Sequence, residues 1–177
     1  MKRLKTNLIV GLAVLALVAP VALAGSKQKG TTMDKVRKEL VTLPYFGVFD
    51  NLEYKVEGDT VTLYGQVVRP STRQDAERRV TRIEGIDRVI NNIEVLPLSG
   101  FDDSIRAREY RTIFRTGGLY RYAMGANPSI HIVVKNGNVT LEGVVSNQMD
   151  SQLAYIAARG VPGVFSVTNN LRVGSNS

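Results

Sequence analysis

Two stretches decide the fold of this chain: VTLYGQV at residues 61–67 and VTLEGVV at residues 139–145. The same shift of 78 residues also aligns GIDRVINNIEV at 85–95 with GVFSVTNNLRV at 163–173. Over residues 61–95 and their shifted counterparts, 12 of 35 ungapped positions are identical, whereas chance at ordinary composition gives about two. The chain therefore contains two copies of one unit, and its fold has to be read as a repeat.

Each copy shows the pattern of a strand hairpin followed by a helix and a third strand. In the first copy, apolar and polar residues alternate over 52–56, a glycine-containing turn follows, and residues 61–67 resume the alternation. Ser71 or Thr72 is the expected cap of the helix, in which apolar residues recur at helical spacing. A third alternating stretch, 89–95, completes the unit.

A further helix is predicted ahead of each hairpin. In the first copy, apolar residues recur at helical spacing from Met33 to Leu43, and Pro44 ends the run. In the second copy, the helix is expected at roughly 102–116. It is followed by an extra segment, 117–128, which has no clear counterpart in the first copy. This segment is the main asymmetry between the two copies.

The element order predicts an α+β fold of two tandem small modules, each helix-strand-strand-helix-strand. A hairpin pairs its strands antiparallel, whereas two strands joined through a helix favour a parallel pair with a right-handed crossover. Each module should therefore hold a mixed three-stranded sheet covered by two helices on one face. We place the first module at 33–98 and the second at 101–174.

The two repeated blocks, Val-Thr-Leu-x-Gly-x-Val and Gly-Val/Ile-x-x-Val-x-Asn-x-Leu/Ile-x-Val, resemble the BON domain, and both occur twice in register. The resemblance covers nearly all of the chain after residue 24. It implies tandem BON domains of the osmotically inducible periplasmic type, which are associated with phospholipid membranes. The lipoprotein members carry a lipid-modified Cys, but this chain has no Cys and is closer to the soluble periplasmic type.

The residues of the repeated motif have structural explanations. Gly65 and Gly143 are expected where a strand face meets the packed helices, so that a side chain there would displace a helix. Asn91 and Asn169 are expected to interrupt the last strand, where a short amide bonds nearby backbone. Contact of these amides with a ligand is the alternative. The motif also includes the glycine expected to stop the preceding helix, Gly85, and its counterpart Gly163.

The amino terminus is typical of an export signal. Basic residues at 2–5 precede an apolar run, and residues 22–24 have the small-x-small pattern of a cleavage site. We expect a signal peptide at 1–24 that is cleaved after Ala24, a flexible leader at 25–32, and a periplasmic protein. A retained membrane anchor is the alternative, because the apolar run is only slightly shorter than a spanning helix, although Pro20 interrupts it.

The side chains that catalysis or metal binding requires are not grouped in this sequence. His131 is the only histidine and there is no Cys, so a triad or a metal site has no partner for it. We expect His131 to be a solvated or hydrogen-bonded residue of a strand. The acids are scattered, and Asp102 with Asp103 fits the start of a helix. We therefore expect no enzymatic activity, no cofactor and no metal.

Without residues 1–24 the chain keeps 20 basic and 16 acidic side chains, a formal net charge of +4. This balance permits an anionic partner such as phospholipid headgroups but does not require one. The candidates for membrane or lipid binding all lie in the second copy, on the helix expected at 102–116 or directly after it: Arg108, Arg111, Arg115, Tyr120, Arg121 and Tyr122.

Aromatic residues lie beside these arginines. Tyr110 and Phe114 belong to an apolar arc that adjoins the arginine side of the helix, and such a pairing suits the boundary of lipid headgroups. The alternative is that the aromatic residues belong to the core and the arginines form a solvated face. Asp102, Asp103 and Glu109 are expected to offset part of the basic charge.

The leading hypothesis is a non-enzymatic periplasmic binding module that associates weakly with anionic phospholipid membrane and supports envelope integrity or stress tolerance. The second copy should do the binding, with Tyr45, Phe46 and Phe49 of the first as a second contact. The alternative is a protein-protein interaction module that docks on an envelope complex through its sheet faces. Nucleic-acid binding, which the basic charge and the small α/β module also permit, is disfavoured by the export signal.

Overall fold

The computed structural model describes residues 31–125 and 127–174. The predicted signal peptide lies outside them, and so does the predicted leader except for Thr31 and Thr32, which cap and begin the first helix. The first module follows the predicted order, with its elements at α1 (Thr32–Val41), β1 (Asn51–Glu57), β2 (Thr60–Val67), α2 (Pro70–Thr81), β3 (Arg88–Asn91) and β4 (Glu94–Val95).

The second module repeats this order with one insertion, a 3-10 helix labelled η1. Its elements are α3 (Gly100–Arg115), η1 (Leu119–Ala123), β5 (Ile130–Lys135), β6 (Asn138–Val145), α4 (Gln148–Arg159), β7 (Ser166–Asn169) and β8 (Arg172–Val173). From β2 onward, every element of the first module recurs 78 residues later with the same length. The sequence repeat is therefore a repeat of structure.

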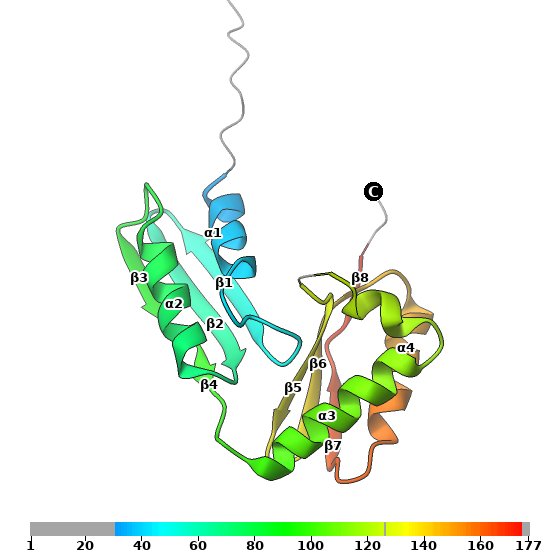
Figure 1. Cartoon of the computed structure of the whole chain (residues 1–177). Helices are drawn as coiled ribbons and strands as arrows, with labels where there is room; N and C mark the ends of the chain where they lie inside the picture. Colours follow the sequence, from blue (N-terminus) through cyan, green and yellow to red (C-terminus); the bar gives the residue numbers. More distant parts are fainter. Residues whose placement is uncertain (1–30, 126, 175–177) are drawn as a thin grey trace, which may run out of the picture.

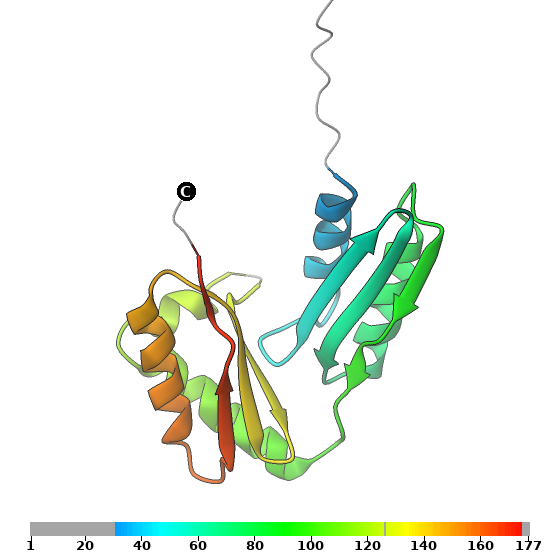
Figure 2. The ribbon, with the colours of Figure 1, turned by 180° about the vertical axis from the view of Figure 1, so that it is seen from behind.

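Both sheets have the same mixed topology. β1 pairs antiparallel with β2, which pairs parallel with β3 and with the short β4. β5, β6, β7 and β8 pair in the same way. Figures 1 and 2 show that α1 and α2 cover one face of the first sheet, and that α3 and α4 cover one face of the second. The predicted fold class is confirmed, with the difference that the third strand of each module is divided in two.

The motif asparagines explain this division. The Asn91 side-chain oxygen accepts a hydrogen bond from the Ile93 N–H (3.2 Å), and its amide nitrogen donates to the Arg73 carbonyl on α2 (3.1 Å). Asn169 makes the equivalent bonds to the Leu171 N–H and to Ser151 on α4. Each amide thus replaces ladder hydrogen bonds and ties the break to a helix, as predicted for a local structural role.

The reason predicted for Gly65 and Gly143 is wrong. A Cβ on Gly65 would lie 2.1 Å from the Asn51 carbonyl oxygen, which belongs to the neighbouring strand and not to a helix. A Cβ on Gly143 would meet the Ser129 carbonyl oxygen at the same distance. Both glycines also have positive φ angles, +112° and +117°. Glycine is required because the partner strand's backbone comes too close for a side chain.

Two predicted helix ends are also wrong. α2 begins at Pro70 with Arg69 as its N-cap, two or three residues before the predicted cap at Ser71 or Thr72, because proline fits the first position of a helix. α2 ends at Thr81. Gly85 therefore does not stop it, but provides a positive φ of +90° in the turn that follows, as its counterpart Gly163 does at +89°.

Each module has its own hydrophobic core between its sheet and its two helices. In the first, alternate residues of β2 are fully buried against α1 and α2. The fully buried residues of that core are Val36, Val61, Leu63, Val67, Ala76 and Val80. In the second, Ile105 and Ile113 of α3 pack on β5 and β6. Within the described ranges, no helix is long and apolar enough to span a bilayer.

Candidate functional site

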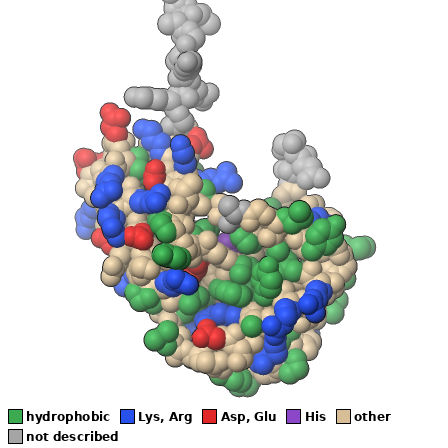
Figure 3. Space-filling view, viewed as in Figure 1, with side chains coloured by type: hydrophobic (Ala, Val, Ile, Leu, Met, Phe, Trp, Pro, Cys, Tyr) green, Lys and Arg blue, Asp and Glu red, His purple; other side chains and the backbone are tan. Residues whose placement is uncertain are grey.

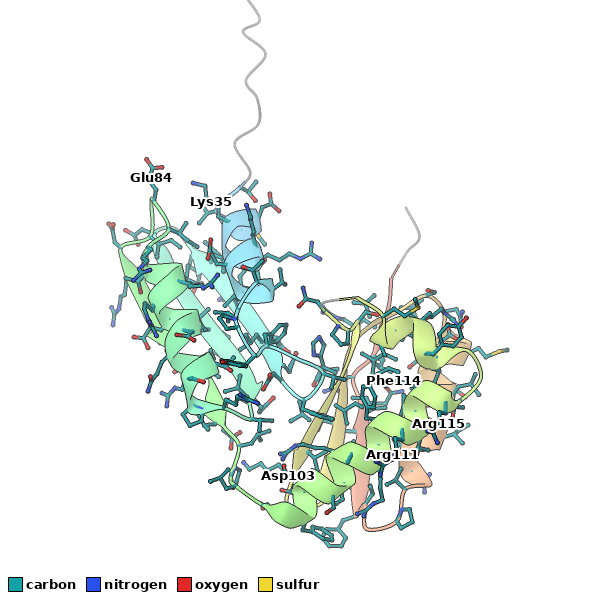
Figure 4. The ribbon with its side chains drawn as sticks, viewed as in Figure 1. Lys35, Glu84, Asp103, Arg111, Phe114 and Arg115 are labelled. Atoms are coloured by element: carbon teal, nitrogen blue, oxygen red, sulfur yellow. The ribbon has the colours of Figure 1, made fainter. Side chains whose placement is uncertain are left out.

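The arginine row, which consists of Arg108, Arg111 and Arg115, lies on the outer side of α3. The opposite side of the helix is buried through Ile105 and Ile113, neither of which is exposed to solvent. The three arginines share one side because they are spaced by three and four residues. Arg111 and Arg115, labelled in Figure 4, are exposed, and Arg108 is half-buried. Figure 3 shows a line of basic side chains over this helix.

Two buried charged residues, Asp102 and Arg106, attach α3 to the hairpin formed by β5 and β6. The Asp102 carboxylate accepts hydrogen bonds from the N–H groups of Asn136 (2.9 Å) and Gly137 (2.8 Å). Arg106 donates to the Val134 carbonyl (2.6 Å). Asp102 lies in the first turn of a helix, as predicted, but its carboxylate accepts hydrogen bonds from the hairpin backbone. These bonds set the orientation of α3, and hence of the arginine row.

Glu109 lies in the middle of the buried side of α3 and has no solvent exposure. Among the described residues, neither of its carboxyl oxygens has a hydrogen-bond partner. Burial raises the pKa of Glu109 to about 8, so the side chain is uncharged at neutral pH. Glu109 therefore does not offset the arginine row as predicted. Asp103 is the exposed acid of the first turn.

An aromatic cluster borders the arginine row on one side. The rings of Tyr110 and Phe114 lie 5.0 Å apart, and Phe49 contacts Tyr110 with ring centroids 6.3 Å apart. Phe114 is 7% exposed, whereas Tyr110 is 41% exposed. Both interpretations of the apolar arc are therefore correct in part: Phe114 belongs to the core, and Tyr110 lies at the surface. In Figure 3 a hydrophobic area adjoins the line of basic side chains.

Phe49 comes from the first module, on the docking loop (residues 42–50) that joins α1 to β1. The Ile132 N–H on β5 donates to the Val48 carbonyl on this loop (2.7 Å). Phe46 stacks on His131 at 5.3 Å between ring centroids. Val48 and Phe49 also pack against the core of the second module. Phe46 and Phe49 are half-exposed and contact the second module, so the loop joins the two modules, and the second lipid contact stays a prediction.

His131 lies at this junction. Its Nδ1 donates to the Gly47 carbonyl (3.2 Å), because a carbonyl oxygen only accepts. Burial lowers the pKa of His131, so the ring favours its neutral form. The buried Asp50 carboxylate accepts from the Gly47 and Val68 N–H groups, and burial raises its pKa. The predicted hydrogen-bonded strand histidine is confirmed, and its role is to hold the modules together.

The three candidates on η1 point in different directions. Tyr120 is 62% exposed, whereas Tyr122 is 6% exposed and its hydroxyl donates to Asp150 (2.6 Å). Arg121 forms an ion pair with the same carboxylate. A 3-10 helix has three residues per turn, so consecutive side chains cannot share a face. Tyr122 is therefore not a surface group, whereas Tyr120 is exposed, and Arg121 is exposed but paired with Asp150 at the start of α4.

A pair of exposed aromatic residues was not predicted. Phe101, at the start of α3, lies 5.9 Å from Phe165, in the turn before β7, and the two are 48% and 73% exposed. A comparison of the two copies could have identified Phe165 as a surface residue, because the equivalent residue in the first copy is the polar Asp87. A hydrophobic residue at a position that is polar in the other copy indicates a surface difference rather than a core requirement.

Exposed hydrophobic side chains are unevenly distributed. Of the thirteen large ones among the described residues, ten lie at or beyond Leu98, and so belong to the second module or to the linker before it. Among residues 31–125 and 127–174, no group of three or more His, Cys, Asp or Glu side chains is arranged to hold a metal ion.

Two copies of one small α+β module, one of them with basic and aromatic side chains on an outer helix, define a tandem-module binding protein. The chain belongs to the BON domain family, whose model matches residues 29–97 and 121–175. BON domains are non-catalytic binding modules that are linked to phospholipid membranes and stress tolerance. The second match begins after α3, so the arginine row lies outside both matched segments.

No curated protein matches the chain. Two similar solved structures are of CdsD, a structural protein of the type III secretion system of Chlamydia trachomatis. One, of its C-terminal domain, is 11% identical over 80% of this chain and 96% of that chain, with a TM-score of 0.29. The other is 11% identical over 82% and 93%, with the same TM-score. Likenesses this weak carry no functional argument.

Proposed function

We propose that the second module binds the surface of anionic phospholipid membranes through the arginine row, with Tyr110 and Tyr120 entering the headgroup boundary. One observation carries this proposal. The three arginines share an outer helix face, and within the described part of the chain none of them forms an ion pair. Unpaired guanidinium groups beside exposed aromatic rings are suited to phosphate headgroups.

The buried acids of α3 strengthen this proposal. Glu109 is uncharged at neutral pH and so does not repel an anionic surface, and the Asp102 carboxylate is buried and bonded to the hairpin. Each basic residue near such a surface contributes about 1 kcal/mol, so the row supplies about 3 kcal/mol. Partial burial of the two tyrosines adds about 2 kcal/mol. Attachment of this strength is peripheral and reversible, and it weakens as salt screens the charges.

The cellular setting is part of the proposal. The basic residues, apolar run and cleavage pattern of residues 1–24 support export and a periplasmic location after cleavage. A protein that touches phospholipid there supports envelope integrity under stress, osmotic stress included. Fractionation of cells that produce the full chain tests the location: recovery of an uncleaved protein in the cytoplasm contradicts it.

Cosedimentation with vesicles tests the lipid contact. The chain from residue 25 onward should sediment with phosphatidylglycerol vesicles and much less with phosphatidylcholine, and Arg111→Glu with Arg115→Glu should abolish the difference. The matched control is Arg82→Glu with Arg88→Glu, which changes the net charge equally at exposed positions of the first module. Equal recovery on both lipids, or equal loss in both double variants, rejects a specific role for the row.

A hollow over the open face of the second sheet favours a second candidate function, docking of an envelope protein. It has a volume of about 540 Å³ and lies between that sheet and the β4 end of the first module. Most of its lining residues are polar, among them Gln66, Asn138, Thr140 and Asn170, beside a Lys135–Glu94 ion pair (2.6 Å). Crosslinking in cells from Thr168, on this lining, should capture one reproducible protein if this function is correct.

A further inference from the structure

The outer face of α4 is the strongest unexplained surface of the molecule. α4 packs beside α3 on the same face of the second sheet, and Ala154 and Ala158 on its inner side have no solvent exposure. On its outer side, Met149 is 72% exposed and Ile156 is 63% exposed. Large hydrophobic side chains this exposed contribute nothing to the core of their own module.

The first module provides an internal comparison. α2 occupies the same place 78 residues earlier, and its inner residues Ala76 and Val80 are fully buried like their counterparts in α4. Most of the outer positions differ, although the exposed Gln74 has an identical exposed counterpart in Gln152. Where α2 and the turn after it have Ser71, Glu77, Arg78 and Asp87, α4 and its turn have Met149, Tyr155, Ile156 and Phe165. The inner faces have the same role in both copies, whereas large exposed hydrophobic side chains occur on the outer face of α4 only.

We propose that the outer face of α4, together with the Phe101–Phe165 pair, is a second membrane contact whose apolar side chains enter the bilayer interface. This inference rests on the proposed function of the arginine row. It makes the whole helical layer of the second module, and not α3 alone, the part that lies on the membrane.

Contacts between the two helices make the surface continuous. A Cβ on Gly163, in the turn after α4, would lie 3.4 Å from Arg108 Nη2 and 3.5 Å from the Phe101 ring. At the other end of α4, Asp150 pairs with Arg121 of η1. The arginine row is thus bordered by the aromatic cluster on one side, and by the Phe101–Phe165 pair and α4 on the other.

Charge favours a lipid surface over a protein partner at this face. The acid of α4 is Asp150, which is buried and bonded to Tyr122 and Arg121, and its base is Arg159 at the last position. By contrast, α2 carries five charged residues. An apolar helix face without exposed acids, beside arginines, is the arrangement found in helices that lie in the interface of an anionic bilayer.

Site-directed fluorescence tests the inference, and the absence of native cysteine makes single-cysteine labelling direct. Met149→Cys and Ile156→Cys would each carry an environment-sensitive label, and the equivalent α2 positions, Ser71→Cys and Arg78→Cys, are the controls. With phosphatidylglycerol vesicles, the α4 labels should shift to the blue and be quenched by lipids with spin-labelled acyl chains. The α2 labels should not change.

A variant with Met149→Ser and Ile156→Arg, the residues of the first copy, adds a second readout. It should bind these vesicles about tenfold more weakly, because two partly buried apolar side chains are lost. Since Ile156→Arg adds positive charge, simple electrostatics predicts tighter binding instead. Weakening of the variant therefore supports apolar insertion, and unchanged or tighter binding contradicts it.

The remaining outcomes separate this inference from the function on which it rests. If the protein sediments with anionic vesicles but the emission of the α4 labels does not change, the inference is overturned and the proposed role of the arginine row is unaffected. A protein that does not sediment at all overturns both. If the α4 labels respond to protein concentration in the absence of vesicles, the face is a contact between copies of the chain, and insertion is rejected.

Discussion

The backbone N–H of Ile132 donates a hydrogen bond to the backbone carbonyl of Val48, over 2.7 Å and from one module to the other. β5 is the edge strand of the second sheet, so the docking loop of the first module covers part of an exposed edge. The same loop brings Phe49 to Tyr110, beside the arginine row. The junction between the modules therefore forms part of the candidate site.

Phe49→Ala tests the junction. The substitution removes the ring that contacts Tyr110, and it should lower the free energy of unfolding by about 2 kcal/mol. It should also let the modules move apart, which small-angle X-ray scattering detects as a larger radius of gyration. Tyr45→Ala in the same loop is the control, because Tyr45 is 66% exposed and its loss should change stability by less than about 1 kcal/mol. An unchanged radius in Phe49→Ala contradicts the prediction.

His131 should titrate below the usual range of histidine. It is the only histidine of the chain, so one imidazole signal in an NMR titration reports it directly. Burial lowers its pKa from 6.5, so the unfolded state binds the proton more readily than the folded state. The stability contributed by neutral His131 is present above pH 6.5 and is lost as the pH falls below it. A measured pKa at or above 6.5 would show that the junction is open in solution.

The junction's pH dependence can be removed by substitution. His131→Phe keeps a ring to stack on Phe46 but cannot titrate. Urea unfolding at pH 7 and pH 5.5 should therefore show a smaller acid-induced loss of stability in the variant than in the native chain. The same loss in both proteins would assign the effect to another group.

Glu109→Gln should stabilise the protein at alkaline pH. The pKa of Glu109 is about 8 in the folded state and about 4.5 in the reference state, so the folded state binds the proton more tightly. The stability that depends on the proton is present below pH 4.5 and is lost as the pH rises to about 8. Relative to its effect at pH 4, the substitution should therefore raise the free energy of unfolding at pH 9 by on the order of 5 kcal/mol.

Thermal unfolding across pH measures this effect. The control is Glu84→Gln, which removes an exposed carboxylate from the turn after α2 (Figure 4). Parallel stability curves for the native chain and Glu109→Gln between pH 4 and pH 9 would show that Glu109 is hydrated.

Gly65→Ala should be far more damaging than Gly58→Ala. A Cβ on Gly65 would lie 2.1 Å from the Asn51 carbonyl oxygen, so the β1–β2 pair must move, at more than about 3 kcal/mol. Gly58 also has a positive φ, +63°, but a Cβ there meets nothing within 4 Å, and the strain alone costs about 1 kcal/mol. Equal losses in guanidinium unfolding would refute close backbone approach as the reason for Gly65.

The sequence alone was sufficient to predict the fold of each module. Its duplication, the alternation in residues 52–56 and 61–67, and the helical spacing of the apolar residues predicted two α+β units with mixed sheets. These features are local, because a strand or a helix repeats its buried side every two or every three to four residues. The spacing of Arg108, Arg111 and Arg115 placed them on one helix side for the same reason.

Only the tertiary structure decided which of these groups are available and how the modules meet. The burial of Tyr122, the pairing of Arg121 with Asp150, and the contact of Phe49 with Tyr110 each join segments that are far apart in the chain. Such contacts depend on how packed elements are oriented, which no local periodicity encodes. The repeat therefore determined the two modules, and packing between distant segments determined the surface that the second one presents.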